Sequence, residues 1–340
     1  MGSSRAAKQL SHQKGLYVIR IIVKLFAVTI VLTAFLHVAL RVVPAHAAGP
    51  RNFVYLSASG VNGQGCTGSA PCPTFGDGFA ALEAAETGGR ILCLDPVADV
   101  SSMSFALANI AFDIDCPGGS WGGAPNGAGY VLLNNGSNVT LTFRNMAFDG
   151  VGGPPSAFQM IGSGTLIFEN CVFQNFSGIA LDIEPTGPFN LVITNSRMSN
   201  NSGGVVLKPG AGGSVTATFN GVTIAGNMGG GLKSDTTNGA VSLDISNSTI
   251  SNNAGNGMNA VSGAGGTNML NIKNSVIARN GSAGVQANGA NAAALVNNTL
   301  LDSNKAGATS AIGGGRILTY GNNSIVGTSG SGFTGAAPLQ

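Results

Sequence analysis

Two stretches that lie twenty-five residues apart read Leu141-Thr142-Phe143-Arg144-Asn145-Met146-Ala147-Phe148 and Leu166-Ile167-Phe168-Glu169-Asn170-Cys171-Val172-Phe173. Both follow one pattern: two apolar residues separated by one position, an asparagine two positions on, and a third apolar residue three positions after it. Alternation of this kind has the two-residue period of a β-strand and not the 3.6-residue period of a helix. The pattern therefore predicts a strand, a corner at the asparagine and a second, shorter strand.

The same pattern recurs toward the C-terminus. The asparagine positions of the copies are Asn145, Asn170, Asn195, Gly221, Asn247, Asn274, Asn298 and Asn322, with steps of 25, 25, 26, 26, 27, 24 and 24 residues. A repeat of this length is typical of one turn of a solenoid, in which each unit stacks on its neighbours. The sequence thus predicts an all-β fold with coils of about 25 residues, each coil pairing with the coils above and below it.

A second asparagine column runs in step with the first. Its members, each before a glycine-containing turn and a short alternating strand, are Asn175, Asn201, Asn227, Asn253, Asn280 and Asn304. A sharp bend between strands needs a left-handed backbone conformation, which asparagine and glycine adopt at low cost. Stacked asparagine amides also hydrogen-bond from one layer to the next, as in cross-β ladders. We therefore expect asparagine at the corners and amide stacking along the axis.

The third apolar position of each copy forms an inward column. It consists of Phe148, Phe173, Met198, Ile224, Ile250, Ile277, Leu301 and Ile325. We expect these side chains to stack through the core, with aromatic residues giving way to aliphatic ones toward the C-terminus.

Residues 1–47 differ from the rest of the chain. They hold six basic residues and no acid, an apolar run from Leu25 to Leu40, and the sequence Ala45-His46-Ala47. A basic start, an apolar middle and an A-x-A stop are typical of a secretory signal peptide. The alternative is an uncleaved membrane anchor, although sixteen apolar residues fall short of the ~20 that span a bilayer. We predict a signal peptide over 1–47 and a secreted or periplasmic protein.

The low content of charged residues argues against nucleic-acid binding. Charged residues make up 9% of the 340 residues, against about 25% in an average globular protein. The formal charge of +2 belongs to the export segment: six of the 16 Lys and Arg residues lie there, so 10 remain against 14 Asp and Glu, a net charge of −4. A basic patch for nucleic acid is not expected.

The three histidines lie before the predicted cleavage site, at His12, His37 and His46. Histidine is the commonest general base and the commonest metal ligand in proteins. The mature chain therefore excludes Ser-His-Asp triads, Cys-His nucleophiles and histidine zinc sites.

All five cysteines lie in the predicted exported part, where oxidising surroundings favour disulfides. Cys66 and Cys72 can close a short loop, and Cys93 and Cys116 are 23 residues apart, close to one coil; Cys171 is then left over. Free, buried thiols are the alternative for each of these pairs.

At this point the chain resembles the right-handed parallel β-helix of the pectate-lyase-like superfamily, which has coils of this length and asparagine corners. The segment from Cys66 to Pro96 is similar to the N-terminal part of secreted bacterial β-helix proteins, in which a short helix covers the end of the coil. The resemblance implies such a helix over 80–86, capped by Thr74 with Asp77 as a weak capping box and ended by Gly88. The domains expected are a signal peptide (1–47), an N-terminal cap with the cysteine loop and the helix (48–90), a right-handed, single-stranded parallel β-helix (91–327) and a glycine-rich tail (328–340).

The resemblance does not determine the activity, because this fold hosts unrelated functions. A polygalacturonase-like site needs a histidine and close carboxylates, including an Asp-Asp pair that the chain lacks. Alginate lyase and epimerase relatives carry Asp-Pro-His, whereas here Asp95-Pro96 is followed by Val97. A pectate-lyase-like site needs carboxylates for Ca²⁺, which takes six to eight oxygen ligands, and an arginine or lysine as base.

One cluster of charged residues meets part of the requirements of a pectate-lyase-like site. Strand alternation places Asp182, Lys208 and Asp235 in one outward column, with Lys233 beside it and Glu184 just past Asp182. As a sugar-acid site, the two aspartates would bind Ca²⁺, the two lysines would act as base or hold substrate carboxylates, and Glu184 would contact substrate. The alternative is a ladder of ion pairs between strands, which is common and worth only ~0.2–1 kcal/mol per pair.

Three further features each allow a functional and a structural interpretation. Trp121 lies in a glycine-rich segment. Its side chain could stack on a sugar ring or, as the structural alternative, pack into a side of the coil stack and close it. Asp113 and Asp115 suit a weak metal site or a solvated strand face, and Arg144 with Glu169 suits a second ion ladder.

Three functions remain. The first is an exported β-helix without catalysis that acts as a surface-structural or carbohydrate-binding module. The second is a calcium-dependent polysaccharide lyase acting by β-elimination on an acidic glycan. The third is the passenger of a larger surface machine, for which the C-terminal residues give no barrel segment or sorting signal. A glycan is the expected partner, and a membrane is expected only through an uncleaved signal segment. The last coil, near Asn322, is expected to leave a strand edge that the glycine-rich tail or another subunit covers.

Overall fold

The structure, a computed structural model, describes residues 52–63, 65–83, 88–99, 111–122, 132–133, 139–150, 156–327 and 332–337. The predicted signal peptide lies outside these residues and remains a prediction. Residues 51–340 form one compact unit by themselves. Within the described residues, no helix is long and apolar enough to cross a membrane.

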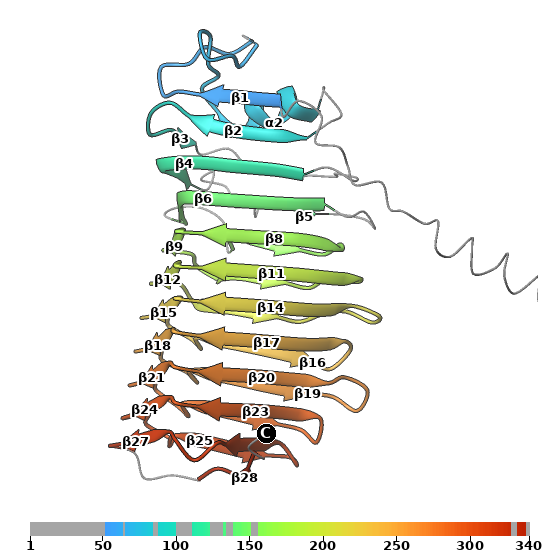
Figure 1. Cartoon of the computed structure of the whole chain (residues 1–340), viewed down its shortest axis with the longest axis vertical. Coiled ribbons are helices and arrows are strands. Elements are labelled where there is room, and N and C mark those ends of the chain that lie inside the picture. Colours follow the sequence, from blue (N-terminus) through green and yellow to red (C-terminus); the bar gives the residue numbers. More distant parts are fainter. Residues whose placement is uncertain are drawn as a thin grey trace, which may run out of the picture. The chain divides into compact units, whose positions relative to one another are not determined.

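Every named strand pairs in parallel, and the strands form two sheets (Figure 1). The smaller one, called here the eight-stranded sheet, takes one strand from each coil. Its members are β5 (Leu132–Leu133), β7 (Phe158–Met160), β10 (Ile179–Ile183), β13 (Gly203–Leu207), β16 (Leu232–Thr236), β19 (Met258–Ser262), β22 (Val285–Asn288) and β25 (Thr309–Ile312).

The larger sheet takes a long strand and a short strand from most coils. The long strands are β1 (Asn52–Leu56), β2 (Gly89–Cys93), β4 (Ala111–Gly122), β6 (Val139–Asp149), β8 (Gly164–Glu169), β11 (Pro188–Thr194), β14 (Ser214–Asn220), β17 (Ala240–Ser246), β20 (Asn268–Lys273), β23 (Ala292–Asn297), β26 (Arg316–Thr319) and β28 (Gly335–Ala336). The short strands are β3 (Ala98–Asp99), β9 (Val172–Gln174), β12 (Arg197–Ser199), β15 (Thr223–Ala225), β18 (Thr249–Ser251), β21 (Val276–Ala278), β24 (Leu300–Asp302) and β27 (Ser324–Val326). Because β4 and β6 continue through the corner, long and short strands belong to one sheet.

The strand register places equivalent repeat positions in contact. Leu191 of β11 lies between Leu166 of β8 and Ala217 of β14, and Met198 of β12 lies between Phe173 and Ile224 in the same way. A one-residue slip would turn every apolar side chain of a strand to the outside, so the buried face fixes the register. The predicted fold of stacked parallel coils is confirmed.

The inward column is buried from Phe148 to Leu301, and the change from aromatic to aliphatic residues is confirmed. Ile325 is the exception. It aligns with Leu301 on β24 but is 44% exposed, because no further strand among the described residues covers β27. The prediction that Ile325 lies in the core was therefore wrong.

The aromatic end of the core is one cluster of rings. Its members are Phe75, Trp121, Phe143, Phe148, Phe158, Phe168 and Phe173. Phe148 stacks on Phe173 at 4.8 Å between ring centroids, and Trp121 stacks on Phe75 at 5.6 Å. Rings of one coil thus pack on those of the next, in the offset and edge-to-face arrangements that aromatic pairs prefer.

The first asparagine column makes the predicted left-handed corners in every copy but the last, where Asn322 has no positive φ and the preceding Gly321 forms the corner with φ of 82°. Asn145, Asn170, Asn195, Asn247, Asn274 and Asn298 have φ between 44° and 58°. Gly221, which replaces asparagine in one copy, has φ of 67°. These two residue types tolerate the conformation that a sharp corner requires.

The second column is a buried amide ladder. The Nδ2 of Asn201 donates to Oδ1 of Asn227 at 3.1 Å, and the series continues through Asn253 and Asn280 to Asn304 at distances of 2.8 to 3.0 Å. The predicted amide stacking is confirmed for these five residues.

The prediction that Asn175 is a member of this ladder was wrong. Asn175 has φ of 63° and lies one position earlier, and Phe176 is buried in the ladder position. The backbone N–H of Phe176 donates to Oδ1 of Asn201 at 3.0 Å. The phenyl ring fits here because Gly150, in the preceding coil, has no side chain in the space that the ring fills.

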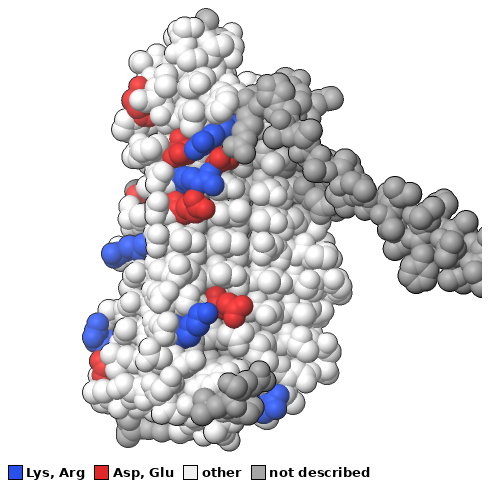
Figure 2. Space-filling model, in the orientation of Figure 1, with Lys and Arg blue, Asp and Glu red and all other residues white. Residues whose placement is uncertain are grey.

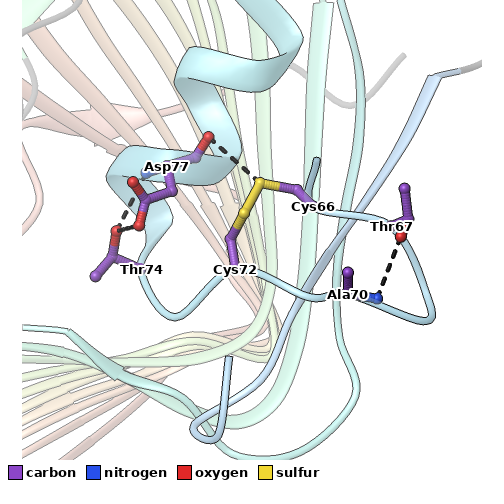
Figure 3. Close-up of a disulfide and its surroundings, with 6 residues drawn as sticks. All are labelled: Cys66, Thr67, Ala70, Cys72, Thr74 and Asp77. Carbon is purple, nitrogen blue, oxygen red and sulfur yellow. Dashed lines mark hydrogen bonds between the residues drawn. A yellow bond between two sulfur atoms is a disulfide. The ribbon is translucent and has the colours of Figure 1, made fainter. Parts of the chain in front are cut away.

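The helix α2 (Phe75–Glu83) covers the N-terminal end of the coils (Figure 3). Thr74 Oγ1 accepts the N–H of Asp77 at 3.1 Å, which is the first bond of the predicted capping box, whereas Asp77 Oδ2 accepts from the Thr74 hydroxyl at 2.6 Å and not from its backbone N–H. The helix begins at Phe75, five residues earlier than predicted. Asp99 accounts for this early start, because its Oδ2 accepts the Phe75 N–H at 2.8 Å and satisfies a donor that the helix itself cannot.

Both predicted disulfides are present. The loop closed by Cys66–Cys72 is drawn in Figure 3. It lies on the free edge of β1, where Tyr55 N donates to Cys66 O and Cys72 N donates to Tyr55 O. Cys93–Cys116 ties β2 to β4. Because β1 is paired on one side and covered by the loop on the other, this end of the sheet is protected from other strands.

Cys171 is a free, buried thiol. Burial raises its pKa to about 12, so it is not a reactive thiolate at neutral pH.

The C-terminal segment covers part of the last edge. In β28, Gly335 and Ala336 pair with Leu318 and Thr319 of β26. Of the two alternatives, the tail therefore covers β26. Thr328 and the tail residues beyond 337 lie outside the described residues.

The buried amide ladder gives the first test. Asn253→Ala is expected to lower the free energy of unfolding by about 3 kcal/mol, because it leaves the backbone N–H and the Nδ2 of Asn227 without their acceptor and removes the amide that donates to Ile224 O. Chemical denaturation followed by circular dichroism measures the change. Asn271→Ala, which removes one exposed amide bond to Asp244, serves as control and is expected to stay within about 0.5 kcal/mol of the wild type. Equal losses in the two variants would contradict a structural role for the ladder.

Candidate functional site

The five predicted charged site residues lie on the outer face of the eight-stranded sheet, on β10, β13 and β16 or directly after them. The predicted column was wrong in register. Asp182 aligns with Val206 and, one strand further, with Lys233. Lys208 follows the pair Ile183–Leu207 and therefore lies beside Glu184. The sheet thus contains two adjacent columns, Asp182–Val206–Lys233 and Glu184–Lys208–Asp235.

Both lysines are engaged in ion pairs. Lys208 Nζ contacts Glu184 Oε1 at 2.8 Å, and Lys233 Nζ contacts Asp235 Oδ2 at 2.9 Å. The other oxygen of Asp235 accepts from the hydroxyl and the N–H of Thr237, at 2.7 and 3.1 Å. The cluster is therefore a set of internally paired charges, which is the alternative weighed from the sequence.

The ionisation of Asp182, Asp235 and Lys208 follows from these contacts. The hydrogen bond and charge of Glu184 raise the pKa of Lys208, so this lysine is protonated at neutral pH. Burial, followed by the charge of Glu184, raises the pKa of Asp182 despite the neighbouring Lys208. Burial opposes ionisation of Asp235, but the Thr237 and Lys233 hydrogen bonds outweigh it and lower its pKa. A protonated lysine cannot accept a proton, so Lys208 is unsuited as a base.

The predicted calcium ligands do not converge. With about 4.8 Å between strands and about 3.3 Å per residue, the Cα atoms of Asp182 and Asp235 lie roughly 12 Å apart. Among the residues that the structure describes, no group of three or more His, Cys, Asp or Glu side chains is arranged to hold a metal ion. Asp182 and Asp235 thus do not fit one Ca²⁺, which needs several carboxylate oxygens at about 2.4 Å.

Of the two alternatives for Trp121, the structure confirms the structural one: the ring lies in the coil stack and is not placed to stack on a sugar. Its side chain is 3% exposed and lies within the aromatic cluster. It occupies an inward position of β4, aligned with Phe148. The flanking glycines suggested an exposed loop, but the segment is part of a twelve-residue strand.

A groove of about 400 Å³ lies on the same outer face, next to the ion pairs. Its polar lining comes from Ser202, Lys233, Asn256, Asn259 and Ser282, and glycines on β13 and in the preceding turns form much of the rest. Because glycine has no side chain, backbone groups are close to the surface there. A groove lined by hydrogen-bonding side chains suits a ligand rich in hydroxyl groups.

Asn259 is the residue that sequence reasoning missed. It follows Lys233 in the outward column, and Gln286 follows Asn259. Its Oδ1 is buried and accepts no hydrogen bond from the described residues. An unpaired buried acceptor costs about 1–3 kcal/mol and calls for an explanation. No sequence signal marked Asn259, because asparagine is frequent throughout this chain.

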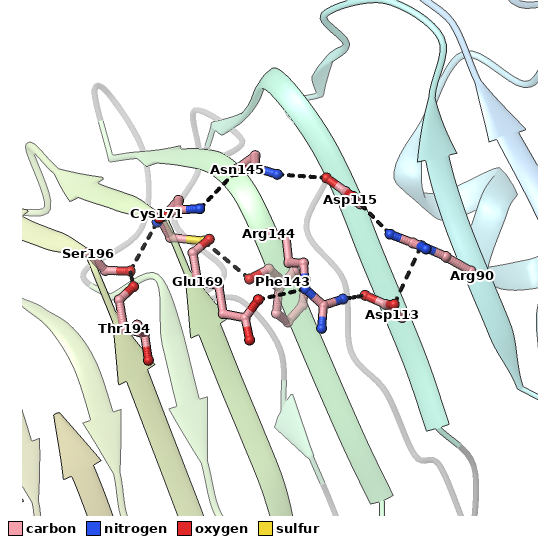
Figure 4. Close-up of polar contacts among 11 residues, drawn as sticks. Arg90, Asp113, Asp115, Phe143, Arg144, Asn145, Glu169, Cys171, Thr194 and Ser196 are labelled. Atoms are coloured by element: carbon pink, nitrogen blue, oxygen red, sulfur yellow. Dashed lines mark hydrogen bonds and ion pairs between the residues drawn. The ribbon is translucent and has the colours of Figure 1, made fainter. Parts of the chain in front are cut away.

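A second charged cluster lies on the long strands, and its side chains form ion pairs with one another (Figure 4). Arg144 binds Asp113 and Glu169, and Arg90 binds Asp113 and Asp115. Figure 2 shows charged side chains gathered over this part of the visible face, with most of the remainder uncharged. The predicted Arg144–Glu169 ladder is confirmed. Asp113 and Asp115 are partners of two arginines, and neither alternative weighed for them, a metal site or a solvated face, describes this arrangement.

The stacked parallel coils define a right-handed parallel β-helix. The family described as "Right handed beta helix region" matches residues 129–300, which are 172 of 340 residues. The chain belongs to this family.

Several solved structures are similar to this chain. The crystal structure of pectate lyase Pel9A is similar with a TM-score of 0.52 and 17% identity, covering 84% of this chain and 78% of that one. The A-module of mannuronan C-5 epimerase AlgE4 from Azotobacter vinelandii has a TM-score of 0.45 and 15% identity, over 77% and 93%. A rhamnogalacturonan lyase has a TM-score of 0.40 and 14% identity, over 78% and 75%. No curated protein matches the sequence. At these identities the likeness to Pel9A shows the fold alone.

The raised pKa of Asp182 predicts a pH-dependent effect on stability. A carboxyl group whose pKa is higher in the folded than in the unfolded protein destabilises the folded state when it is ionised. The destabilisation is complete at pH values above the folded-state pKa and absent at pH values below the unfolded-state pKa. Asp182→Asn is therefore expected to raise the Tm at pH 7, with a smaller gain as the pH falls toward about 3. Thermal melts of both proteins across this range measure it, and Asp244→Asn on the other sheet controls for the loss of one negative charge. A Tm difference for Asp182→Asn that is independent of pH would contradict the assignment.

The burial of Trp121, the only tryptophan, predicts a spectroscopic result. Its fluorescence is expected to be blue-shifted and resistant to iodide, and to stay unchanged when a glycan is added. Emission spectra with increasing iodide measure this. Strong quenching of the folded protein by iodide would contradict the core position.

Proposed function

We propose that this protein binds a glycan without chemical turnover, in the groove on the outer face of the eight-stranded sheet. The observation that carries the proposal is the polar groove at Ser202, Asn256 and Ser282 together with the unpaired Oδ1 of Asn259. Sugars supply hydroxyl groups that both donate and accept hydrogen bonds. Carbohydrate ligands are also named for the polysaccharide enzymes that share this fold, although the fold by itself does not imply a function.

The arrangement of charge favours binding over catalysis. Catalysis by β-elimination needs a base that is unprotonated at working pH. Lys208 is held protonated by Glu184, and Lys233 is bound to Asp235. The lyase hypothesis also assigned Ca²⁺ to Asp182 and Asp235, which do not converge on one ion. A calcium-dependent lyase is thus the less favoured function.

We further propose that the protein acts outside the cytoplasm. Two disulfides fit an oxidising compartment, and residues 1–47 have the pattern of an export signal. Few charges and many small polar side chains on the coil surface are suited to contact with glycans or with other surface components.

A binding and turnover screen tests the proposal. The purified protein is run through native gels that contain single polysaccharides, and the same polysaccharides are incubated with it with and without Ca²⁺. Retardation by at least one glycan, with no unsaturated product absorbing near 235 nm, is expected. Calcium-dependent absorbance would establish the lyase instead. Failure of every glycan to retard the folded protein would overturn glycan binding.

A further inference from the structure

The charged residues beside the groove indicate whether the glycan is neutral or acidic. Three carboxylates and two ammonium groups lie here: Asp182, Glu184, Asp235, Lys208 and Lys233. Each lysine is already bound to a carboxylate, at 2.8 and 2.9 Å. Asp182 adds a carboxylate without a lysine of its own, so the cluster is net negative by one charge when all are ionised. A polyuronate would bring further carboxylates to this face and would find no unpaired cation among the cluster's residues.

The unpaired amide calls for a hydrogen-bond donor on the ligand. Oδ1 of Asn259 is an acceptor and needs a donor. A sugar hydroxyl can donate to the oxygen of this amide and accept from its nitrogen; every sugar carries such groups, so the charge of the cluster is what disfavours a polyuronate. Lys233, one strand away in the same column, keeps its ammonium on Asp235.

We infer that the ligand is a neutral, hydroxyl-rich glycan and not a polyuronate, with Asn259 as a specificity-determining contact. This inference rests on the proposed function, because it names the ligand class of the same groove. Affinity is expected to depend little on ionic strength, since no charge pair forms between protein and ligand.

Affinity electrophoresis of the full chain tests the inference. One set of gels contains neutral polysaccharides (β-glucan, galactomannan and dextran) and the other contains polygalacturonate and alginate, each at low and high salt. Retardation by a neutral glycan at both salt concentrations, without retardation by the two polyuronates, is expected. Retardation by the polyuronates alone would overturn the inference and leave the proposed function intact. No retardation in any gel would overturn both.

Variants of the groove make the test specific. Asn259→Ala is expected to weaken binding of the retarding neutral glycan roughly ten-fold, the effect of one lost hydrogen bond. Asn271→Ala, on an outward position of the other sheet, is the matched control and is expected to bind like the wild type. Equal affinity of Asn259→Ala and wild type would exclude Asn259 as a contact.

A gain-of-function variant tests the charge argument separately. Asp235→Asn removes the carboxylate that holds Lys233 and leaves an unpaired ammonium beside the groove. Retardation of this variant by polygalacturonate, abolished by salt, is expected. If Asp235→Asn is folded by circular dichroism but is not retarded by polygalacturonate, pairing of the lysines does not determine ligand class, and the inference fails.

Discussion

The register of the parallel strands is the constraint on which the rest of the structure depends. Backbone hydrogen bonds join each coil to the next, and the buried faces allow one register only. The inward column from Phe148 to Leu301, the amide ladder from Asn201 to Asn304 and the left-handed corners all repeat in that register. A change in one coil therefore acts on its two neighbours, as in other repeat proteins.

The same register decides which outward side chains neutralise one another. Because Lys208 lies beside Glu184 and Lys233 bonds to Asp235, both cations are already engaged. What remains for a ligand is a groove of amides, hydroxyls and backbone, with one acceptor that has no partner. Under the proposed function, this face recognises its ligand by hydrogen bonds to neutral groups more than by charge. The two ends of the coil stack differ. Helix α2 and the Cys66–Cys72 loop cover the N-terminal end, whereas Ile325 at the C-terminal end is 44% exposed.

The sequence predicts the fold well because period-2 alternation and asparagine corners are local signals that repeat. Thr74 with Asp77 and the two disulfides were also predictable from local spacing. The columns of the eight-stranded sheet were not, because corners of different length shift Lys208 by two positions relative to Asp182, and this shift depends on the whole coil. Trp121 was left with two alternatives because glycines in a strand look like a loop, and Asn259 was missed because an unpaired amide is visible only when its neighbours are known.

The measurement that tests the central claim most directly is an NMR titration of the lysine side chains in wild type, Glu184→Gln and Asp182→Asn. The claim is that register pairs Lys208 with Glu184 and leaves Asp182 as a minor neighbour. The pKa of Lys208 is expected to fall clearly in Glu184→Gln and to change less in Asp182→Asn. The reverse order would place Lys208 in the column of Asp182 and contradict the account of this face.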